Sequence, residues 1–171
     1  MKIRSDFVTN SSSSSYLTAR IDSPVLADIL RRLKAQLENP PLPDGREKER
    51  AMEAYEYSGL DRFISVEEPN GSVCEFDTDG GGGLGAPRAI EGLGSAVYEA
   101  LCRYAEGNYS FDEGHIDVIE ELERRSAEIA ESTTKVSWRC GEENWGEFDD
   151  ESASESFTFD RATGKSTFSE S

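Results

Sequence analysis

The stretch from residue 136 to residue 168 decides the fold, and it reads VSWRCGEENWGEFDDESASESFTFDRATGKSTF. Segments rich in β-formers occur at residues 136–140, 156–159 and 166–168, with a shorter candidate at 145–148. Phe157 and Phe159 alternate with polar neighbours, which is typical of a strand with one buried face. Turn residues at 160–164 separate the last two strands. The tail therefore predicts antiparallel strands that close a sheet.

Upstream of this tail the sequence alternates between strand and helix patterns. Ser23 and Pro24 form a helix start, with serine as the N-cap and proline at the first helical position. The apolar stripe that follows predicts a helix ending before Asn39, and we expect it to pack against the sheet that carries Phe157 and Phe159. Further elements are expected as a strand at residues 15–21, a short charged helix at 46–57, a hairpin at 63–76, and longer helices at 87–106 and 114–132.

These elements predict an α+β fold. We expect a largely antiparallel sheet of about five strands, with three longer helices packed mainly on one face. A chain of 171 residues is long enough for a single domain with a substantial core. We therefore divide it into a serine-rich N-terminal segment, residues 1–16, and a single acidic α+β domain, residues 17–171.

The net charge of −17 comes entirely from the C-terminal part of the chain. Residues 1–66 carry ten acidic and ten basic side chains, whereas residues 67–171 carry twenty-five acidic and eight basic ones. Eight acids and no base lie between Arg139 and Arg161. Such a field repels nucleic acid and anionic membranes and attracts cations and basic protein surfaces. We therefore expect a basic protein partner, and neither nucleic acid nor a membrane.

Two tryptophans flank the start of the acidic stretch. Aromatic rings beside carboxylates suit a site for lysine or arginine through cation–π contact. The predicted partner-binding residues are Trp138, Glu142, Glu143, Trp145, Glu147, Asp149, Asp150 and Glu151. Two other interpretations stay open: the acids form a solvated loop that keeps the protein soluble, and the indoles pack in the core.

A glycine-rich loop follows the expected hairpin and precedes an expected helix. Gly80, Gly82 and Gly85 match G-x-G-x-x-G, whose backbone N–H groups cradle a phosphate when a helix starts at the loop. Asp77 and Asp79 would repel a phosphate at the mouth of this loop, and four consecutive glycines meet the pattern through low complexity alone. We interpret the loop as a flexible connector, with a phosphate site as the alternative.

Thiol and imidazole groups are scattered along the chain. Cys74, Cys102 and Cys140 form neither a close pair nor a C-x-x-C motif, and His115 is the only histidine. This usage predicts no metal site and no cofactor, and it favours a reducing, cytoplasmic location. We interpret His115 as a surface histidine at the start of a helix, because no nucleophile or fixed carboxylate stands at a useful spacing. The N-terminus lacks the apolar core of a secretory signal.

The serine-rich N-terminal segment reads MKIRSDFVTNSSSSSY. It resembles the opening of assorted uncharacterised bacterial proteins, mostly from Gram-positive anaerobes, which begin K-I-R-x-D-F-V-T-N-S-S-S-S-S followed by an aromatic residue. The resemblance covers residues 1–16 only, and it implies a bacterial origin and a shared handling signal or docking element, with no activity attached. The candidate modification sites are Ser11, Ser12, Ser13, Ser14 and Ser15. A plain polar loop or strand edge is the open alternative.

No constellation in the sequence reaches the specificity of a catalytic signature, so an enzyme is not the favoured hypothesis. The favoured hypothesis is a non-enzymatic intracellular binding protein whose acidic C-terminal surface engages a basic protein, as inhibitors, immunity proteins and DNA mimics do. One alternative is a small enzyme or binder of phosphate or nucleotide ligands that uses the loop at residues 80–85. Another is a substrate that a second enzyme modifies on residues 11–15.

Overall fold

The computed structural model describes residues 13–67, 71–79, 85–144 and 151–170, and it describes the backbone alone at 13–15, 73–79, 142–144 and 151–154. The first half contains β1 (Ser13–Asp22), α2 (Pro24–Glu38), α3 (Arg46–Ser58), α4 (Leu60–Phe63), β2 (Ile64–Glu67) and β3 (Gly71–Asp79). The second half contains the 3₁₀ turn η1 (Ile90–Gly92), α5 (Leu93–Ala105), the 3₁₀ turn η2 (Val118–Glu120), α6 (Glu121–Arg124), α7 (Ser126–Ser132), β4 (Lys135–Asn144), β5 (Glu151–Asp160) and β6 (Lys165–Glu170).

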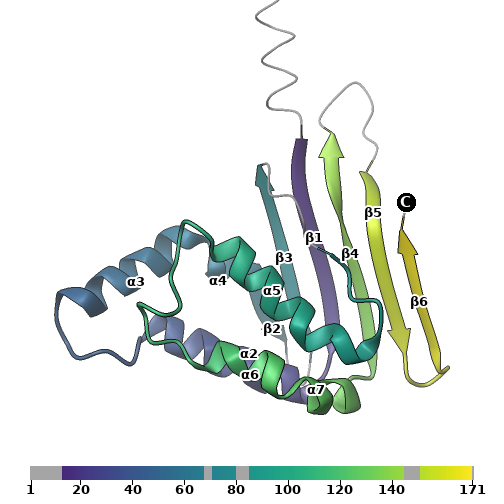
Figure 1. The fold of residues 1–171 in the computed structure, drawn as a ribbon, viewed down its shortest axis with the longest axis horizontal. Helices are drawn as coiled ribbons and strands as arrows, with labels where there is room; N and C mark the ends of the chain where they lie inside the picture. Colours follow the sequence, from purple (N-terminus) through teal and green to yellow (C-terminus); the bar gives the residue numbers. More distant parts are fainter. Residues whose placement is uncertain (1–12, 68–70, 80–84, 145–150, 171) are drawn as a thin grey trace, which may run out of the picture.

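All six strands form one antiparallel sheet in the order β2-β3-β1-β4-β5-β6, with the helices to one side of it (Figure 1). This confirms the α+β class, with six strands where about five were expected. The expected hairpin is formed by β2 and β3, and β4, β5 and β6 form the closing meander. Strand β1 joins these two parts because it pairs with β3 on one side and β4 on the other.

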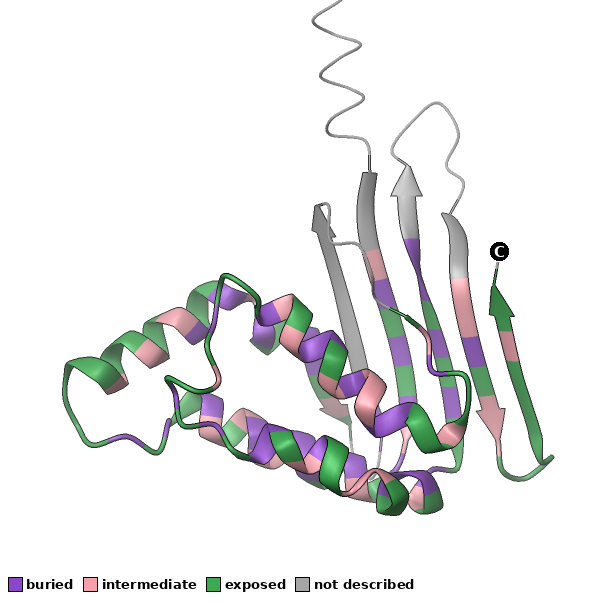
Figure 2. Cartoon of the chain, in the orientation of Figure 1, coloured by how far each residue is buried: buried purple, intermediate pink, exposed green. Residues whose placement is uncertain are grey.

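The strands alternate between buried and exposed residues, as Figure 2 shows. Leu17, Ala19 and Ile21 of β1 are buried, whereas Thr18 and Arg20 between them are exposed. Successive side chains of a strand point to opposite faces of the sheet. One face therefore packs against the helices, and the other faces solvent.

Helix α2 begins as the sequence predicts. The Ser23 hydroxyl accepts a hydrogen bond from the Leu26 N–H at 3.1 Å, and Pro24 occupies the first turn. The buried residues of the helix form the expected stripe: Leu26, Ala27, Ile29, Leu30, Leu33 and Leu37. Its contacts with the sheet, however, are chiefly with β2 and β3, and β1 and β4 separate β3 from the strand that carries Phe157 and Phe159. The expectation that α2 packs against the sheet that carries Phe157 and Phe159 is confirmed, because all six strands belong to one sheet, but α2 lies over its β2–β3 part.

Two expected helices are interrupted. The helix expected at residues 87–106 starts later, because Ala89 has an extended backbone (φ −150°) and only η1 precedes α5. The single helix expected at residues 114–132 is three pieces, η2, α6 and α7, with a break at Arg125 (φ −104°, ψ 25°). The two pieces on either side of the break, α6 and α7, each contact α5. The expected strand at residues 145–148 lies outside the described residues.

Candidate functional site

Acidic residues from three strands meet at one end of the sheet. Asp77 and Asp79 lie at the end of β3, Glu142 and Glu143 lie just before the last residue of β4, and β5 begins with Glu151. We call these five residues the acidic sheet end. The ends of the strands concerned lie together at the top of Figure 1. The antiparallel pairing thus brings acidic positions that are up to 74 residues apart in the sequence to one end of the sheet.

The register aligns part of this cluster in a single cross-strand row. Ser14 of β1 pairs with Asp79 of β3 and with Glu143 of β4, and Glu143 in turn pairs with Glu151 of β5. Residues directly opposite each other in antiparallel strands have Cβ atoms about 5 Å apart, and like charges in such positions destabilise a sheet. Glu143 and Glu151 occupy such directly opposed positions of β4 and β5.

The predicted partner-binding residues divide into three groups. Trp138 is 1% exposed and lies on the helix-covered face of β4, so its indole belongs to the core and does not form part of a contact surface. This corrects the prediction for Trp138 and favours the core-packing interpretation. Glu142, Glu143 and Glu151 lie in the acidic sheet end, where their role stays a prediction. Trp145, Glu147, Asp149 and Asp150 lie outside the described residues.

The candidate modification sites fall partly within β1. Ser13, Ser14 and Ser15 are its first three residues, and their backbone pairs with β4, with Ser14 and Ser15 also pairing with β3. Ser11 and Ser12 lie outside the described residues. In the folded chain, part of the serine run is therefore a central strand, which differs from both the polar loop and the strand edge considered above.

A carboxylate of the protein itself accepts a hydrogen bond at the described end of the glycine loop. Gly80 and Gly82 lie outside the described residues, and Gly85 is exposed. The next backbone N–H, that of Ala86, donates a 2.7 Å hydrogen bond to a carboxylate oxygen of Glu155 on β5. A phosphate loop needs such N–H groups free and aimed at the ligand from a helix start. Since α5 begins only at Leu93, the described residues do not support the phosphate alternative.

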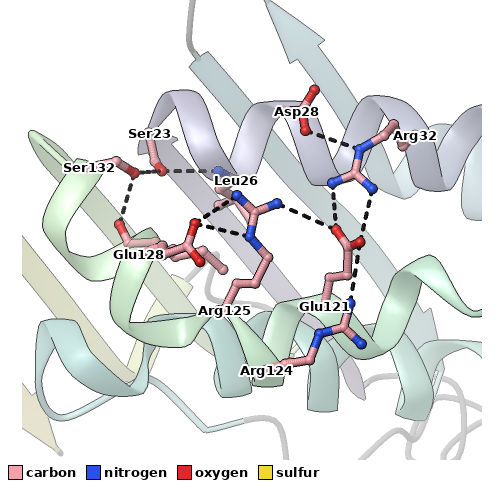
Figure 3. Close-up of polar contacts among 10 residues, drawn as sticks. Ser23, Leu26, Asp28, Arg32, Glu121, Arg124, Arg125, Glu128 and Ser132 are labelled. Atoms are coloured by element: carbon pink, nitrogen blue, oxygen red, sulfur yellow. Dashed lines mark hydrogen bonds and ion pairs between the residues drawn. The ribbon is translucent and has the colours of Figure 1, made fainter.

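A network of ion pairs joins α2 to α6 and α7 (Figure 3). The two terminal NH₂ groups of Arg32 donate to Glu121, and its Nε–H donates to Asp28. Glu121 also lies within 3.4 Å of Arg124 and 3.5 Å of Arg125. The hydrogen bond from Arg32 lowers the pKa of Glu121, so the carboxylate stays charged at a lower pH than an ordinary glutamate. Its partners are all within the chain, and we interpret the network as a structural clamp across the break at Arg125.

The uncovered face of the sheet is polar. Exposed residues on it are Thr18, Arg20, Ser137, Arg139, Thr158 and Thr167. Arg20 pairs with Glu67 at 3.0 Å, and the hydroxyls of Thr158 and Thr167 are in contact across β5 and β6. A polar sheet face is stable in contact with water, since antiparallel sheets commonly have one apolar face on the core and one polar face in solvent.

A cavity of about 520 Å³ lies between α3 and the turn at residues 109–115. Its lining consists of Glu47, Arg50, Ala51, Ala54, Tyr109, Ser110, Glu113, Gly114 and His115. His115 has φ 55°, in the left-handed region, instead of the expected helical start. Sequence reasoning missed this site, because the two halves of its lining are more than fifty residues apart and neither contains a recognisable motif.

Among the described residues, neither a metal-binding cluster nor a membrane-spanning helix provides a further candidate site. In the described part of the chain, no cluster of three or more His, Cys, Asp and Glu side chains is placed to hold a metal ion. None of the helices described there combines the length and apolar composition needed to cross a membrane. Comparison of the chain with protein-family models, with curated proteins and with solved structures gave no match.

Proposed function

We propose that this protein is a non-enzymatic, cytoplasmic binding protein of bacterial origin whose acidic sheet end engages a basic protein. The observation that carries the proposal is the cross-strand row that contains Asp79, Ser14, Glu143 and Glu151. Acidic residues are spread over the last hundred positions of the sequence, but the sheet register brings several of these positions to one end of the sheet.

The energetic cost of this row supports a role in binding. Directly opposed like charges cost a sheet about 0.2 to 1 kcal/mol relative to neutral pairs. A protein that needed acids only for solubility would gain the same benefit with its carboxylates spaced apart. A local loss of folding stability is typical of a binding site, because the bound ligand then supplies the missing favourable contacts. The partner's lysine and arginine side chains would restore the lost energy and speed association by electrostatic attraction.

The test compares two variants with the same change in charge. In the first, Glu142, Glu143 and Glu151 are replaced by glutamine. In the control, the exposed α3 residues Glu49, Glu53 and Glu56 are replaced in the same way. Each tagged protein is used to capture partners from the source cell, and the captured protein is then purified for stopped-flow binding at several salt concentrations.

The proposal expects the first variant to lose capture and to bind with an on-rate at least about tenfold lower at low salt, with a weaker salt dependence. The control should bind like the wild type. The first variant should also be slightly more stable than the wild type, because an opposed like-charge pair is removed. Greater stability with unchanged capture would leave solubility as the explanation and would refute the binding role.

A further inference from the structure

Among the described residues, the sheet is open at the edge that β6 forms. Strand β6 pairs with β5 alone and lies at the outer margin of the molecule in Figure 1. Within this part of the chain, no hydrogen bond reaches the backbone of β6 from any element other than β5. The N–H and C=O groups that point away from the sheet at such an edge are a template for a further strand.

The opposite edge of the sheet is shorter and partly covered. Strand β2 has four residues, whereas β6 has six. The Ile64 carbonyl of β2 accepts a hydrogen bond from Lys34 of α2 at 3.3 Å, and both α2 and α4 pack against β2. Proteins commonly block an exposed edge with a proline, a bulge or charged side chains along the strand. Strand β6 pairs regularly with β5, and its four central residues are uncharged and contain no proline.

The charges of β6 favour a second copy of the same strand as its partner. The strand has a base at its first residue, Lys165, and an acid at its last, Glu170, so its net charge is zero in a protein of net charge −17. A basic protein therefore gains no electrostatic attraction from this edge. In an antiparallel pair, the first residues of one strand meet the last residues of the other. Two copies of β6 thus bring each basic end next to an acidic end, whereas a parallel pair would bring like charges together.

Side chains of β6 alternate between the two faces of the sheet. Phe168 lies opposite Phe157 on the helix-covered face, and Thr167 lies opposite Thr158 on the uncovered face. A twofold axis perpendicular to the sheet would give two copies one continuous sheet, with all the helices on the same face. Residues opposed across that axis come from the same face, and this requirement restricts the allowed registers.

We propose that the protein forms a twofold dimer in which two β6 strands pair antiparallel, with Phe168 opposite Phe168 of the second copy. This register also sets Ser166 opposite Glu170 of the second copy, so that a hydroxyl meets a carboxylate on each side of the axis. Aromatic pairs and hydrogen-bonded pairs across strands both stabilise an antiparallel sheet. Because the second sheet runs in the opposite direction, the two acidic sheet ends lie at opposite ends of the dimer. The dimer is therefore independent of the function proposed above.

Substitutions at Ser166 test this register through the sign of their charge. In the proposed dimer, Ser166→Lys creates two opposite-charge pairs with Glu170 across the interface, and Ser166→Glu creates two like-charge pairs. Thr18→Lys and Thr18→Glu are the controls with the same changes in net charge, because Thr18 is an exposed residue of the central strand β1. Sedimentation equilibrium at protein concentrations from about 1 μM to 1 mM gives the dimer dissociation constant of each protein.

We expect a wild-type dimer with a dissociation constant below about 1 mM. Relative to the matching Thr18 control, Ser166→Lys should lower this constant by about threefold or more, and Ser166→Glu should raise it by a similar factor. Amide hydrogen exchange in β6 should slow as the protein concentration rises, whereas exchange in the edge strand β2 should not change.

Two results would overturn the proposal. The first is a wild-type protein that remains monomeric at about 1 mM. The second is a dimer whose dissociation constant responds equally to the same charge at Ser166 and at Thr18, because its interface would then lie elsewhere. Circular dichroism of all four variants checks that each is folded, and the concentration dependence of amide exchange in the wild type tests the β6 edge without any substitution.

Discussion

Gly94 in the first turn of α5 should not tolerate a single added methyl group. A Cβ built at this position would lie 2.3 Å from the backbone carbonyl oxygen of Leu122, and 3.2 Å from side-chain carbons of Ser126 and Ile129. The first distance is about 1 Å shorter than an ordinary carbon–oxygen contact. Because the obstacle is backbone of α6, relief requires α5 and α6 to move apart.

The expected magnitude follows from two opposing effects. Overpacking of this kind costs about 1 to 3 kcal/mol, and contact with backbone belongs at the upper end of that range. Alanine regains about 1 kcal/mol of helix propensity relative to glycine. Gly94→Ala should therefore destabilise the protein by about 1 to 2 kcal/mol, or lower its melting temperature by roughly 2 to 8 °C for a chain of this size.

Denaturant titration of Gly94→Ala and of a matched control measures this difference. Gly92→Ala is the control, since Gly92 has no heavy atom within 4 Å of an added Cβ and has φ −88°, which alanine adopts freely. The control should stay within about 0.5 kcal/mol of wild type. If Gly94→Ala proved as stable as the wild type or more stable, helix propensity would dominate and the close approach of α5 to α6 would be refuted.

Two further perturbations test the core and the ion-pair network. Leu30→Ala should cost about 2 to 5 kcal/mol in a denaturant titration, because Leu30 is fully buried, and a loss below about 0.5 kcal/mol would contradict its place in the core. Glu121→Gln should cost about 1 kcal/mol at neutral pH, since it removes the charged acceptor of the two terminal NH₂ groups of the partly exposed Arg32, which keeps its hydrogen bond to Asp28. The native pKa of Glu121 is lowered, so this difference should be fully present above about pH 5 and shrink as the pH falls through that pKa. A difference independent of pH would count against the ionic contribution.

Local signals in the sequence were sufficient where one segment determines its own structure. The serine and proline before α2 predict its start, because both act within a single turn. The apolar stripe predicts which of its residues are buried, and the hairpin of β2 and β3 follows from two β-rich segments around a short turn. In each case the interacting groups are neighbours in the chain, so their spacing carries the information.

Features that depend on contacts between distant segments were not predictable in this way. The break at Arg125 depends on how α6 and α7 approach α5, and the periodicity of residues 114–132 is the same with or without it. The partner of the α2 stripe depends on strand order, which alternation does not reveal. The cavity beside His115 has the same origin, because its lining comes from two segments that only the fold brings together.

The position of the serine run limits how it can act. Ser14 pairs with β3 on one side and β4 on the other, so an enzyme that binds an extended substrate would have to pull β1 out of the sheet. A phosphate on Ser14 would add about 1.5 to 2 negative charges at a position that pairs with an acidic residue on either side, Asp79 and Glu143. The folded sheet therefore hinders modification of Ser14, and a phosphate on Ser14 would destabilise the sheet. A handling signal at this serine would act on the unfolded chain, whereas the proposed binding by the acidic sheet end requires the folded sheet.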